Sequence, residues 1–376
     1  MKARVIAFYL PQFHPVKEND EIWGKGFTEW TNVANAKPLF RGHYQPQIPA
    51  DLGFYDLRMP EIREEQAEMA KECGIEGFCY WHYWFGNGRR ILERPFEEVL
   101  KSGTPNFPFC LGWANHSWSN KTWQKSKGLA KDIVFIKQEY PGEQDYIQHF
   151  YTVLPAFKDK RYICVDGKPL FLVFDPEAIP DTELFINTWN RLAKENNLKG
   201  IYFVARVPGF RAKDILNNDS NTVTNNFNYF LNVGYNGINA DMQRYAETKV
   251  AGKFFKISSF VRKKLFGSSL KKYDYKKIMK AMIVPEIQRE DVFPQIIPRL
   301  DRTPRSGKDA RIYANNNPAL FKDSIKEVLD NIKEKPFEKR IVFLQAWNEW
   351  GEGNYMEPDL KYGKKFLTAL KEELDG

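Results

Sequence analysis

Short apolar runs alternate with amphipathic stretches along the chain, which has 376 residues. Each run is mostly apolar over five to seven consecutive positions, as expected for a β-strand buried on both faces of a parallel sheet. The predicted strands are residues 5–10, 75–80, 109–113, 169–174, 201–207, 222–227, 292–298 and 341–347. The stretches between them place apolar residues at helical spacing. The predicted helices are residues 59–73, 94–102, 145–158, 181–197, 273–284, 318–333 and 364–374.

Eight strands in alternation with helices are the pattern of a (β/α)8 TIM barrel, an α/β fold of ~250 residues. The additional length predicts long βα loop insertions, and we expect residues 1–376 to form a single catalytic domain. The rival fold, a doubly wound open sheet, calls for a glycine-rich turn after the first strand. Residues 10–15 contain no glycine, so the sequence favours the barrel. The sixth strand is the least regular, because Asn225 and Asn226 interrupt its apolar character.

In such a barrel the functional residues lie at the C-terminal ends of the strands. Three of the five histidines, His14, His82 and His116, follow predicted strands, as does much of the tryptophan. The opposite strand ends carry solvated charges such as Lys168 and Arg340. This polarity predicts one functional site at one mouth of the barrel.

The segment after the last predicted strand carries two glutamates, Glu349 and Glu352, in a glycine-containing turn. At three residues apart, both carboxyl groups can point into one cavity. Like charge and unequal burial beside tryptophan would push their pKa values apart, leaving one carboxyl protonated and the other charged at neutral pH. Cleavage of a glycosidic bond requires such a pair. An acidic surface loop that caps the final helix is the alternative.

Aromatic residues make up 15% of the chain and include ten tryptophans. In residues 81–84 and 113–118 they occur beside histidine and asparagine, the composition of sites that stack on a sugar face and hydrogen-bond its hydroxyl groups. We therefore expect Trp84 and Trp118 to be glycan platforms whose removal leaves the melting behaviour nearly intact. Packing in the core is the alternative for both residues.

Motifs for other chemistries are absent from the sequence. There is no HExxH, no histidine pair at metal-ligand spacing and no GxSxG elbow. Neither GxxxxGK[ST] nor GxGxxG occurs, so nucleotide binding has no local support. We expect no cofactor and no metal site, although the acids and histidines at the mouth leave a divalent ion open.

The net charge of +8 arises from one segment. Residues 249–280 contain eleven Lys or Arg and one acid, so the rest of the chain is slightly acidic and nucleic acid is not an expected partner. We expect a basic insertion at about residues 230–272, with Phe254, Ile257, Phe260 and Leu265 at helical spacing. Three interpretations stay open: peripheral contact of residues 249–280 with an anionic membrane, a helix that covers the barrel, and contact with an acidic glycan.

Four cysteines, at positions 73, 79, 110 and 164, lack CxxC spacing and lie in or beside apolar runs. We expect them to be buried thiols rather than disulfides or metal ligands. The N-terminus shows no signal-peptide pattern, and every apolar run is far below the ~18 residues of a membrane span. These features predict a cytoplasmic protein that is at most peripheral to the inner face of the membrane.

Several longer motifs stand out near the two ends of the chain. They are Phe-Tyr-Leu-Pro-Gln-Phe-His at 8–14, Gly-Phe-Thr-Glu-Trp-Thr-Asn-Val at 26–33, Gly-His-Tyr-Gln-Pro at 42–46, Asp-Leu-Gly-Phe-Tyr-Asp-Leu at 51–57, Asn-Glu-Trp-Gly-Glu-Gly at 348–353 and Glu-Pro-Asp at 357–359. These motifs resemble the WbsX family, whose members are called glycosyltransferase WbsX or glycoside hydrolase family 99-like and are associated with bacterial surface-polysaccharide gene clusters. The similarity covers most of the chain.

The resemblance to the family 99 endo-α-mannosidases, which share the Asn-Glu-Trp-x-Glu-Gly ending, implies a retaining (β/α)8 enzyme with two catalytic glutamates. Glu349 would be the base that activates a hydroxyl of the sugar itself, and Glu352 the acid that protonates the leaving oxygen. Residues 300–305 resemble a Trp-Asp-Asn-Thr-Pro-Arg motif, with Leu300 and Arg302 in place of Trp and Asn. Strand-end positions and the resemblance together give these candidate substrate-binding residues: Tyr9, His14, Trp30, His43, His82, Trp84, Asn115, His116, Trp118, Asp175, Asp301, Arg305, Trp347, Asn348, Trp350 and Glu357.

The leading hypothesis is therefore an enzyme that acts with retention on an α-linked glycosidic bond of a surface polysaccharide of the O-antigen or capsule type. Its expected partner is an oligosaccharide or polysaccharide, including a lipid-linked form. The alternatives are a glycosyltransferase with an activated donor, acting in lipopolysaccharide or capsule biosynthesis, and a non-catalytic glycan-binding barrel. The two glutamates argue against the last.

Overall fold

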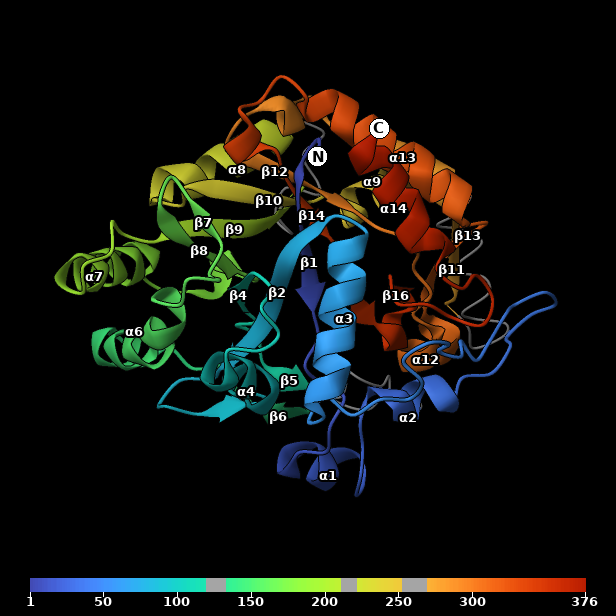
Figure 1. Cartoon of the computed structure of the whole chain (residues 1–376), viewed down its shortest axis with the longest axis horizontal. Coiled ribbons are helices and arrows are strands. Elements are labelled where there is room, and N and C mark those ends of the chain that lie inside the picture. The colour runs from blue at the N-terminus through green and yellow to red at the C-terminus, as the bar shows by residue number, and fades with distance from the viewer. Residues whose placement is uncertain (120–132, 211–221, 252–268) are drawn as a thin grey trace.

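A closed barrel of eight parallel strands forms the centre of the protein (Figure 1). The computed structural model describes residues 1–119, 133–210, 222–251 and 269–376. Neighbouring strands pair in the order β1-β14-β12-β10-β9-β8-β4-β2, and pairing of β1 with β2 closes the barrel. The strands are β1 (Arg4–Tyr9), β2 (Ile75–Trp84), β4 (Phe109–Trp113), β8 (Lys168–Val173), β9 (Tyr202–Pro208), β10 (Gly237–Asp241), β12 (Val292–Ile296) and β14 (Ile341–Leu344). The predicted TIM barrel is confirmed.

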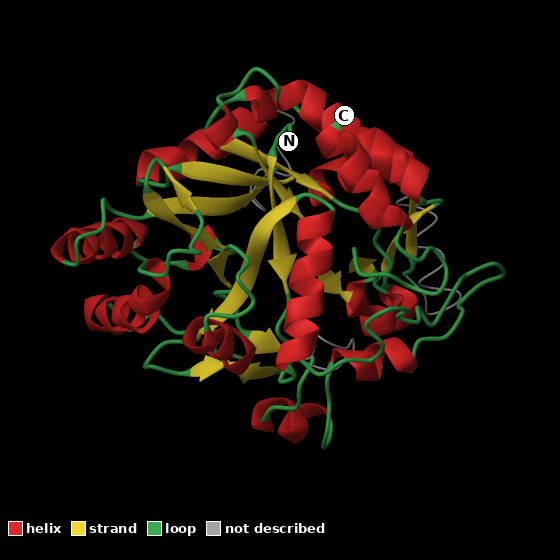
Figure 2. Cartoon of the chain, in the orientation of Figure 1, coloured by secondary structure: helices red, strands yellow, loops and turns green. Residues whose placement is uncertain are grey.

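Helices surround the strands, as the red and yellow layers of Figure 2 show. They bury one apolar stripe against the barrel; on α13, for example, Phe321, Ile325 and Val328 are buried, and the Asn317 side chain caps the first turn by accepting from the Leu320 amide. The helices are α3 (Pro60–Glu72), α4 (Arg94–Ser102), α6 (Glu143–Phe157), α7 (Thr182–Glu195), α8 (Thr222–Val233), α9 (Gln243–Val250), α11 (Tyr275–Met282), α13 (Pro318–Ile332) and α14 (Lys365–Asp375).

The loops after the strands carry short elements of their own. The helical ones are α1 (Lys17–Trp23), α2 (Glu29–Ala34), α12 (Thr303–Ser306), and the 3-10 turns η1 (Pro176–Ala178), η3 (Pro285–Gln288), η4 (Gly307–Asp309), η5 (Phe337–Lys339) and η6 (Trp350–Glu352). The extended ones are β3 (Arg90–Ile91), β5 (Trp118–Ser119), β6 (Val134–Ile136), β7 (Cys164–Val165), β11 (Lys271–Asp274), β13 (Arg311–Ala314), β15 (Asn348–Glu349) and β16 (Asn354–Tyr355).

The predicted sixth strand, residues 222–227, is wrong. These residues begin helix α8, where Val223, Phe227 and Phe230 are buried at helical spacing. The sixth barrel strand is β10, which pairs in parallel with β9 and β12. Its sequence, Gly-Ile-Asn-Ala-Asp, is short and half polar, so its apolar signal is weaker than that of the helix before it.

The predicted basic insertion also needs correction. Residues 237–250 belong to the barrel itself, because they form β10 and the helix α9 that follows it. Lys271–Asp274 forms β11, which pairs with β13 beside the barrel. The proposed amphipathic helix with Phe254 and Leu265 lies outside the described residues. One cysteine prediction is wrong as well, since Cys164 is exposed. No helix in the described ranges is both long and apolar enough to span a bilayer.

Candidate active site

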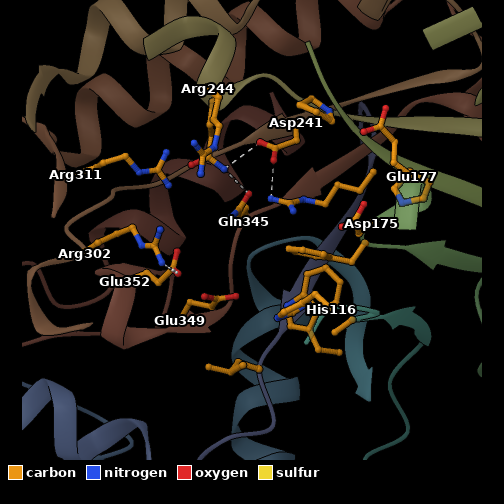
Figure 3. A pocket seen from close by; sticks show the side chains of 18 of the residues that line it. His116, Asp175, Glu177, Asp241, Arg244, Arg302, Arg311, Gln345, Glu349 and Glu352 are labelled. Carbon is orange, nitrogen blue, oxygen red and sulfur yellow. Dashed lines mark hydrogen bonds and ion pairs between the residues drawn. The ribbon is translucent and has the colours of Figure 1, made fainter. Parts of the chain in front are cut away.

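A cavity of about 490 Å³ lies at the C-terminal mouth of the barrel and receives side chains from positions that follow all eight strands. Figure 3 shows Glu349 and Glu352 on one wall, with arginines next to Glu352 and with His116, Asp175 and Glu177 opposite. Its volume falls in the ~300–1,000 Å³ range of ligand pockets. The predicted mouth therefore holds a real cavity.

A short hairpin after β14 places the two glutamates. Strands β15 and β16 pair in antiparallel fashion, with Glu349 on β15 and Glu352 in the intervening turn η6. The buried Asn348 side chain accepts from the Leu10 amide at 2.8 Å and donates to the Leu10 carbonyl at 3.0 Å. This amide bridge fixes the hairpin to the end of β1. Asn348 thus positions Glu349 and does not face the cavity.

Arg305 connects the two carboxyl groups. Its Nη1 lies 2.7 Å from Oε1 of Glu352 and 3.4 Å from Oε2 of Glu349. Its other nitrogens donate to both oxygens of the buried Glu29 of α2, at 2.9 and 2.8 Å. A bidentate pair of this kind fixes the guanidinium in one orientation. Gly351 leaves room for it, because a Cβ at this position would overlap the Glu29 carboxylate.

The two glutamates differ in their electrostatic surroundings. Burial and the nearby Glu352 charge raise the pKa of Glu349 to about 7, against the partial opposition of Arg305. Burial also acts on Glu352, but Arg302 and Arg305 outweigh it and lower the pKa of Glu352 to about 2. Arg302 Nη2 lies 2.9 Å from the same Glu352 oxygen that Arg305 contacts. At neutral pH the site therefore contains an ionised Glu352 and a Glu349 that can carry a proton.

The aromatic wall comes from a different pair of residues than the sequence suggested. Side chains alternate along β2, so Trp81 and Tyr83 line the cavity while His82 and Trp84 face the helices. The Trp84 side chain is 1% exposed and donates to Asp145 of α6, and Trp118 is 0% exposed. The core alternative therefore holds for both tryptophans. The prediction that they form a surface platform is wrong.

Five of the candidate residues line the cavity: Glu349, Glu352, Arg305, His116 and Asp175. His116 is neutral, because burial and then Arg206 lower its pKa to about 4. Burial raises the pKa of Asp175. Asn115 is buried beside them and holds the Asp175 backbone, accepting from its amide at 2.8 Å and donating to its carbonyl at 2.7 Å.

The other candidates are buried around the cavity rather than in it. Tyr9 donates to Gln66 of α3, and His82 shares a hydrogen bond with His149 of α6. His14 is buried, and its burial lowers its pKa to about 4. Glu357 accepts from Tyr55 and Trp350. Trp30, Trp347 and Trp350 pack in the same buried region under the hairpin.

His43 and Asp301 line a second, smaller cavity of about 290 Å³ next to β13. The His43 Nδ1 accepts from the Leu39 amide, so its Nε2 donates to Asp301, at 2.7 Å. Asp301 also accepts from Gln45 and Thr303, and these bonds lower its pKa even though burial opposes them. This cluster supports the Arg302–Arg305 segment, and the Asp301 backbone amide donates to the Glu352 carbonyl at 2.8 Å.

Sequence reasoning missed several residues of the cavity. Trp81 and Tyr83 are the β2 side chains that point into the barrel. The sequence of a strand buried on both faces does not indicate which of its side chains do so. Asp241 was missed because the sixth strand was misplaced, and it pairs with Arg206 at 2.7 Å. Arg244 of α9 and Arg311 of β13 reach the cavity from the loop region after β10 and β12. The described residues contain no cluster of acids, cysteines and histidines arranged to bind a metal ion.

The fold and the cavity define a (β/α)8 barrel protein with a polar site at its C-terminal mouth. Residues 5–370 match the family model described as "Glycosyltransferase WbsX", so the chain belongs to the WbsX glycosyltransferase family, as its motifs predicted.

The chain is also similar to a curated relative and, in fold, to solved structures. The uncharacterised protein WxcX of Xanthomonas campestris pv. campestris, strain B100, is 33% identical over 377 residues, which cover 100% of this chain and 50% of WxcX. The chain thus spans about half the length of the curated relatives it matches. A glycoside hydrolase-like protein has a TM-score of 0.59 at 17% identity, over 99% of this chain and 93% of its own. The GH99 endo-α-mannosidase of Bacteroides thetaiotaomicron has a TM-score of 0.52 at 14% identity, over 99% and 96%. These two structures share the fold.

Proposed function

We propose that this chain cleaves or transfers an α-linked glycosidic bond of a bacterial surface polysaccharide, of the O-antigen or capsule type, with retention of configuration. The observation that supports this best is the carboxyl pair: Glu349 and Glu352 contact one Arg305 nitrogen, and their pKa values are pushed in opposite directions. Two carboxyl groups, one protonated and one ionised, are the machinery of glycosidic bond cleavage.

The charges favour Glu349 as the general acid and Glu352 as the general base, the reverse of the order implied by the resemblance. Glu349 would transfer its proton to the leaving oxygen as the bond to the anomeric carbon breaks. Glu352 would take a proton from a hydroxyl of the sugar itself, whose oxygen then bonds to the anomeric carbon. A carboxyl group held by two arginines is rarely protonated at neutral pH and so seldom has a proton to donate, and Arg302 stands where the similar motif has asparagine.

The opposite order has an electrostatic cost. It requires Glu352 to be protonated while Glu349 is ionised, and the shifts of both pKa values oppose that state. The order with Glu349 as acid avoids this cost.

Retention is supported by the spacing of the two groups. Both carboxyl oxygens lie within 3.4 Å of one nitrogen, so they are closer together than the ~6.5–9.5 Å that inverting enzymes use to admit a water molecule. A short separation suits attack by an oxygen of the substrate or the enzyme.

Transfer to a sugar acceptor from an activated donor is the second candidate, and the name of the family favours it. Product analysis with purified protein separates the two, comparing water alone with an added saccharide acceptor. Hydrolysis of an α-linked oligosaccharide without a nucleotide sugar supports the first. Strict dependence on a nucleotide sugar would exclude it. No turnover under either condition, with intact binding, would favour the non-catalytic barrel.

A cytoplasmic location and a lipid-linked substrate also belong to this proposal. The segment 249–280 supports contact with an anionic leaflet, because each cation near such a surface contributes about 1 kcal/mol. Co-sedimentation with anionic and neutral vesicles tests it. We expect a salt-sensitive preference for anionic vesicles that is lost when Lys271 and Lys272, both exposed, are changed to Glu together with Lys263 and Lys264. Equal binding to both vesicle types would remove the membrane from the proposal.

A further inference from the structure

Five arginines line the cavity. Four of them contact carboxylates. Arg206 pairs with Asp241 at 2.7 Å, Arg302 with Glu352 at 2.9 Å and Arg311 with Glu247 at 2.7 Å. The fourth, Arg305, pairs with Glu29 and also contacts Glu352. Their charges are thus compensated within the protein.

The fifth arginine, Arg244, has no such partner. Within the part of the chain that the structure describes, no carboxylate lies within ion-pair distance of its guanidinium. It projects from α9 towards the same part of the cavity as Arg311 (Figure 3). Among the described residues, Arg244 is therefore the cavity arginine without a paired carboxylate, whereas Asp175 and Glu177 place carboxylates on the opposite wall.

Two of the arginines beside Arg244 are partly accessible. The side chains of Arg302 and Arg311 are 24% and 19% exposed, so their remaining nitrogens are accessible from the cavity. A guanidinium with free donors binds carboxylate and phosphate oxygens better than neutral hydroxyl groups.

From this arrangement we infer that the substrate saccharide carries an oxyanion, which Arg244 binds together with Arg302 and Arg311. The opposite wall fits the rest of the sugar. Asp175 and His116 lie there and offer partners for hydroxyl groups (Figure 3). Trp81 and Tyr83 also line the cavity and offer aromatic faces. The oxyanion is a carboxylate, as in a uronic acid, or a phosphate, as in a phosphorylated sugar, and both can accept two parallel hydrogen bonds from one guanidinium.

The inference rests on the proposed function, because it names the substrate class of the same cavity. Its test is an array of α-linked bacterial oligosaccharides in which each acidic member is printed beside its neutral counterpart, with the carboxylate methyl-esterified or the phosphate removed. Three proteins are compared: the wild type, Arg244→Gln, and Arg191→Gln. Arg191 is an exposed arginine of α7, paired with Glu195 far from the cavity, so its variant has the same loss of charge.

We expect the wild type to bind acidic members at least about tenfold more tightly than their neutral counterparts. Arg244→Gln should lose most of that preference and keep its affinity for the neutral members, whereas Arg191→Gln should behave as the wild type. Higher salt should weaken the preference. The acidic class that gives the signal distinguishes a carboxylate from a phosphate.

Equal binding of acidic and neutral members would overturn the inference and leave the proposed function standing. So would a preference that survives in Arg244→Gln. A loss of binding in Arg191→Gln equal to that in Arg244→Gln would show that net charge, not this site, is responsible. Binding of no member would remove both the inference and the carbohydrate site on which it rests.

Discussion

Replacing each glutamate in turn and varying the leaving group tests the assignment of the acid and the base. Glu349→Gln removes the group whose pKa burial and Glu352 raise to about 7. Gln cannot donate the proton, so with an alkyl leaving group we expect kcat to fall by ~10²–10⁴, the usual worth of general acid catalysis. With a dinitrophenyl leaving group, which departs without a proton, Glu349→Gln should stay within about tenfold of the wild type.

The pH dependence carries the second half of this prediction. In the wild type with a poor leaving group, kcat/KM should fall about tenfold per pH unit above pH 7, because Glu349 loses its proton there. In Glu349→Gln with the activated substrate this decrease should disappear. The remaining base, Glu352, stays ionised down to about pH 2. The wild-type profile alone cannot tell the acid from the base, since either order gives the same singly protonated active state.

The matched control is Glu352→Gln. It should lose a similar factor with both leaving groups, because the base is needed whichever group departs. If Glu352→Gln were the variant rescued by the activated leaving group, then Glu352 would be the acid, as the resemblance implied. Carboxyl NMR titration of the free protein gives an independent check. Two resonances are expected to titrate near pH 7, those of Glu349 and of the buried Glu357, and one of them should be absent from Glu349→Gln.

Three further predictions follow from the surroundings of the pair. Arg302→Gln should raise the pKa of Glu352, seen by carboxyl titration, whereas Arg302→Lys should retain most of the shift because the charge remains; no shift in Arg302→Gln would contradict the role given to Arg302. Gly351→Ala should displace Glu29 from Arg305 and lower kcat by at least about tenfold with little change in the circular dichroism spectrum; wild-type turnover would show that Glu29 does not position Arg305. Trp84→Ala should lower the free energy of unfolding by about 3–5 kcal/mol in denaturant titration, and a loss below about 1 kcal/mol would contradict its placement in the core.

The alternation of strands and helices can be predicted from the sequence because each barrel strand has to be apolar on both faces. Seven of the eight strands follow from this rule, and the residues after them indicate the mouth. The rule fails at residues 222–227, where buried apolar residues at helical spacing look like a strand in a short window. It fails again at β10, because its Asn239 faces a polar partner, Gln295, inside the barrel.

Within the site, sequence and structure contribute differently. Glu349 and Glu352 are only three positions apart, so the sequence alone predicts that their carboxyl groups lie close together. Which side chains of β2 point into the barrel was not predictable, because a strand covered on both sides carries no polar face that marks the outside. His82 and Trp84 were therefore predicted to face the site, whereas Trp81 and Tyr83 are the residues that line the cavity.

The sequence by itself determined the barrel, the mouth that holds the site, the carboxyl pair and the family. Only the tertiary structure decided which carboxyl is protonated, because the deciding charges come from far along the chain. Arg305 meets Glu29 across 276 positions, and Arg311 and Arg302 approach Glu352 from the loops after β12. Electrostatic energy depends on distance and burial in space, and neither quantity is encoded in the local pattern from which strands, helices and motifs are recognised.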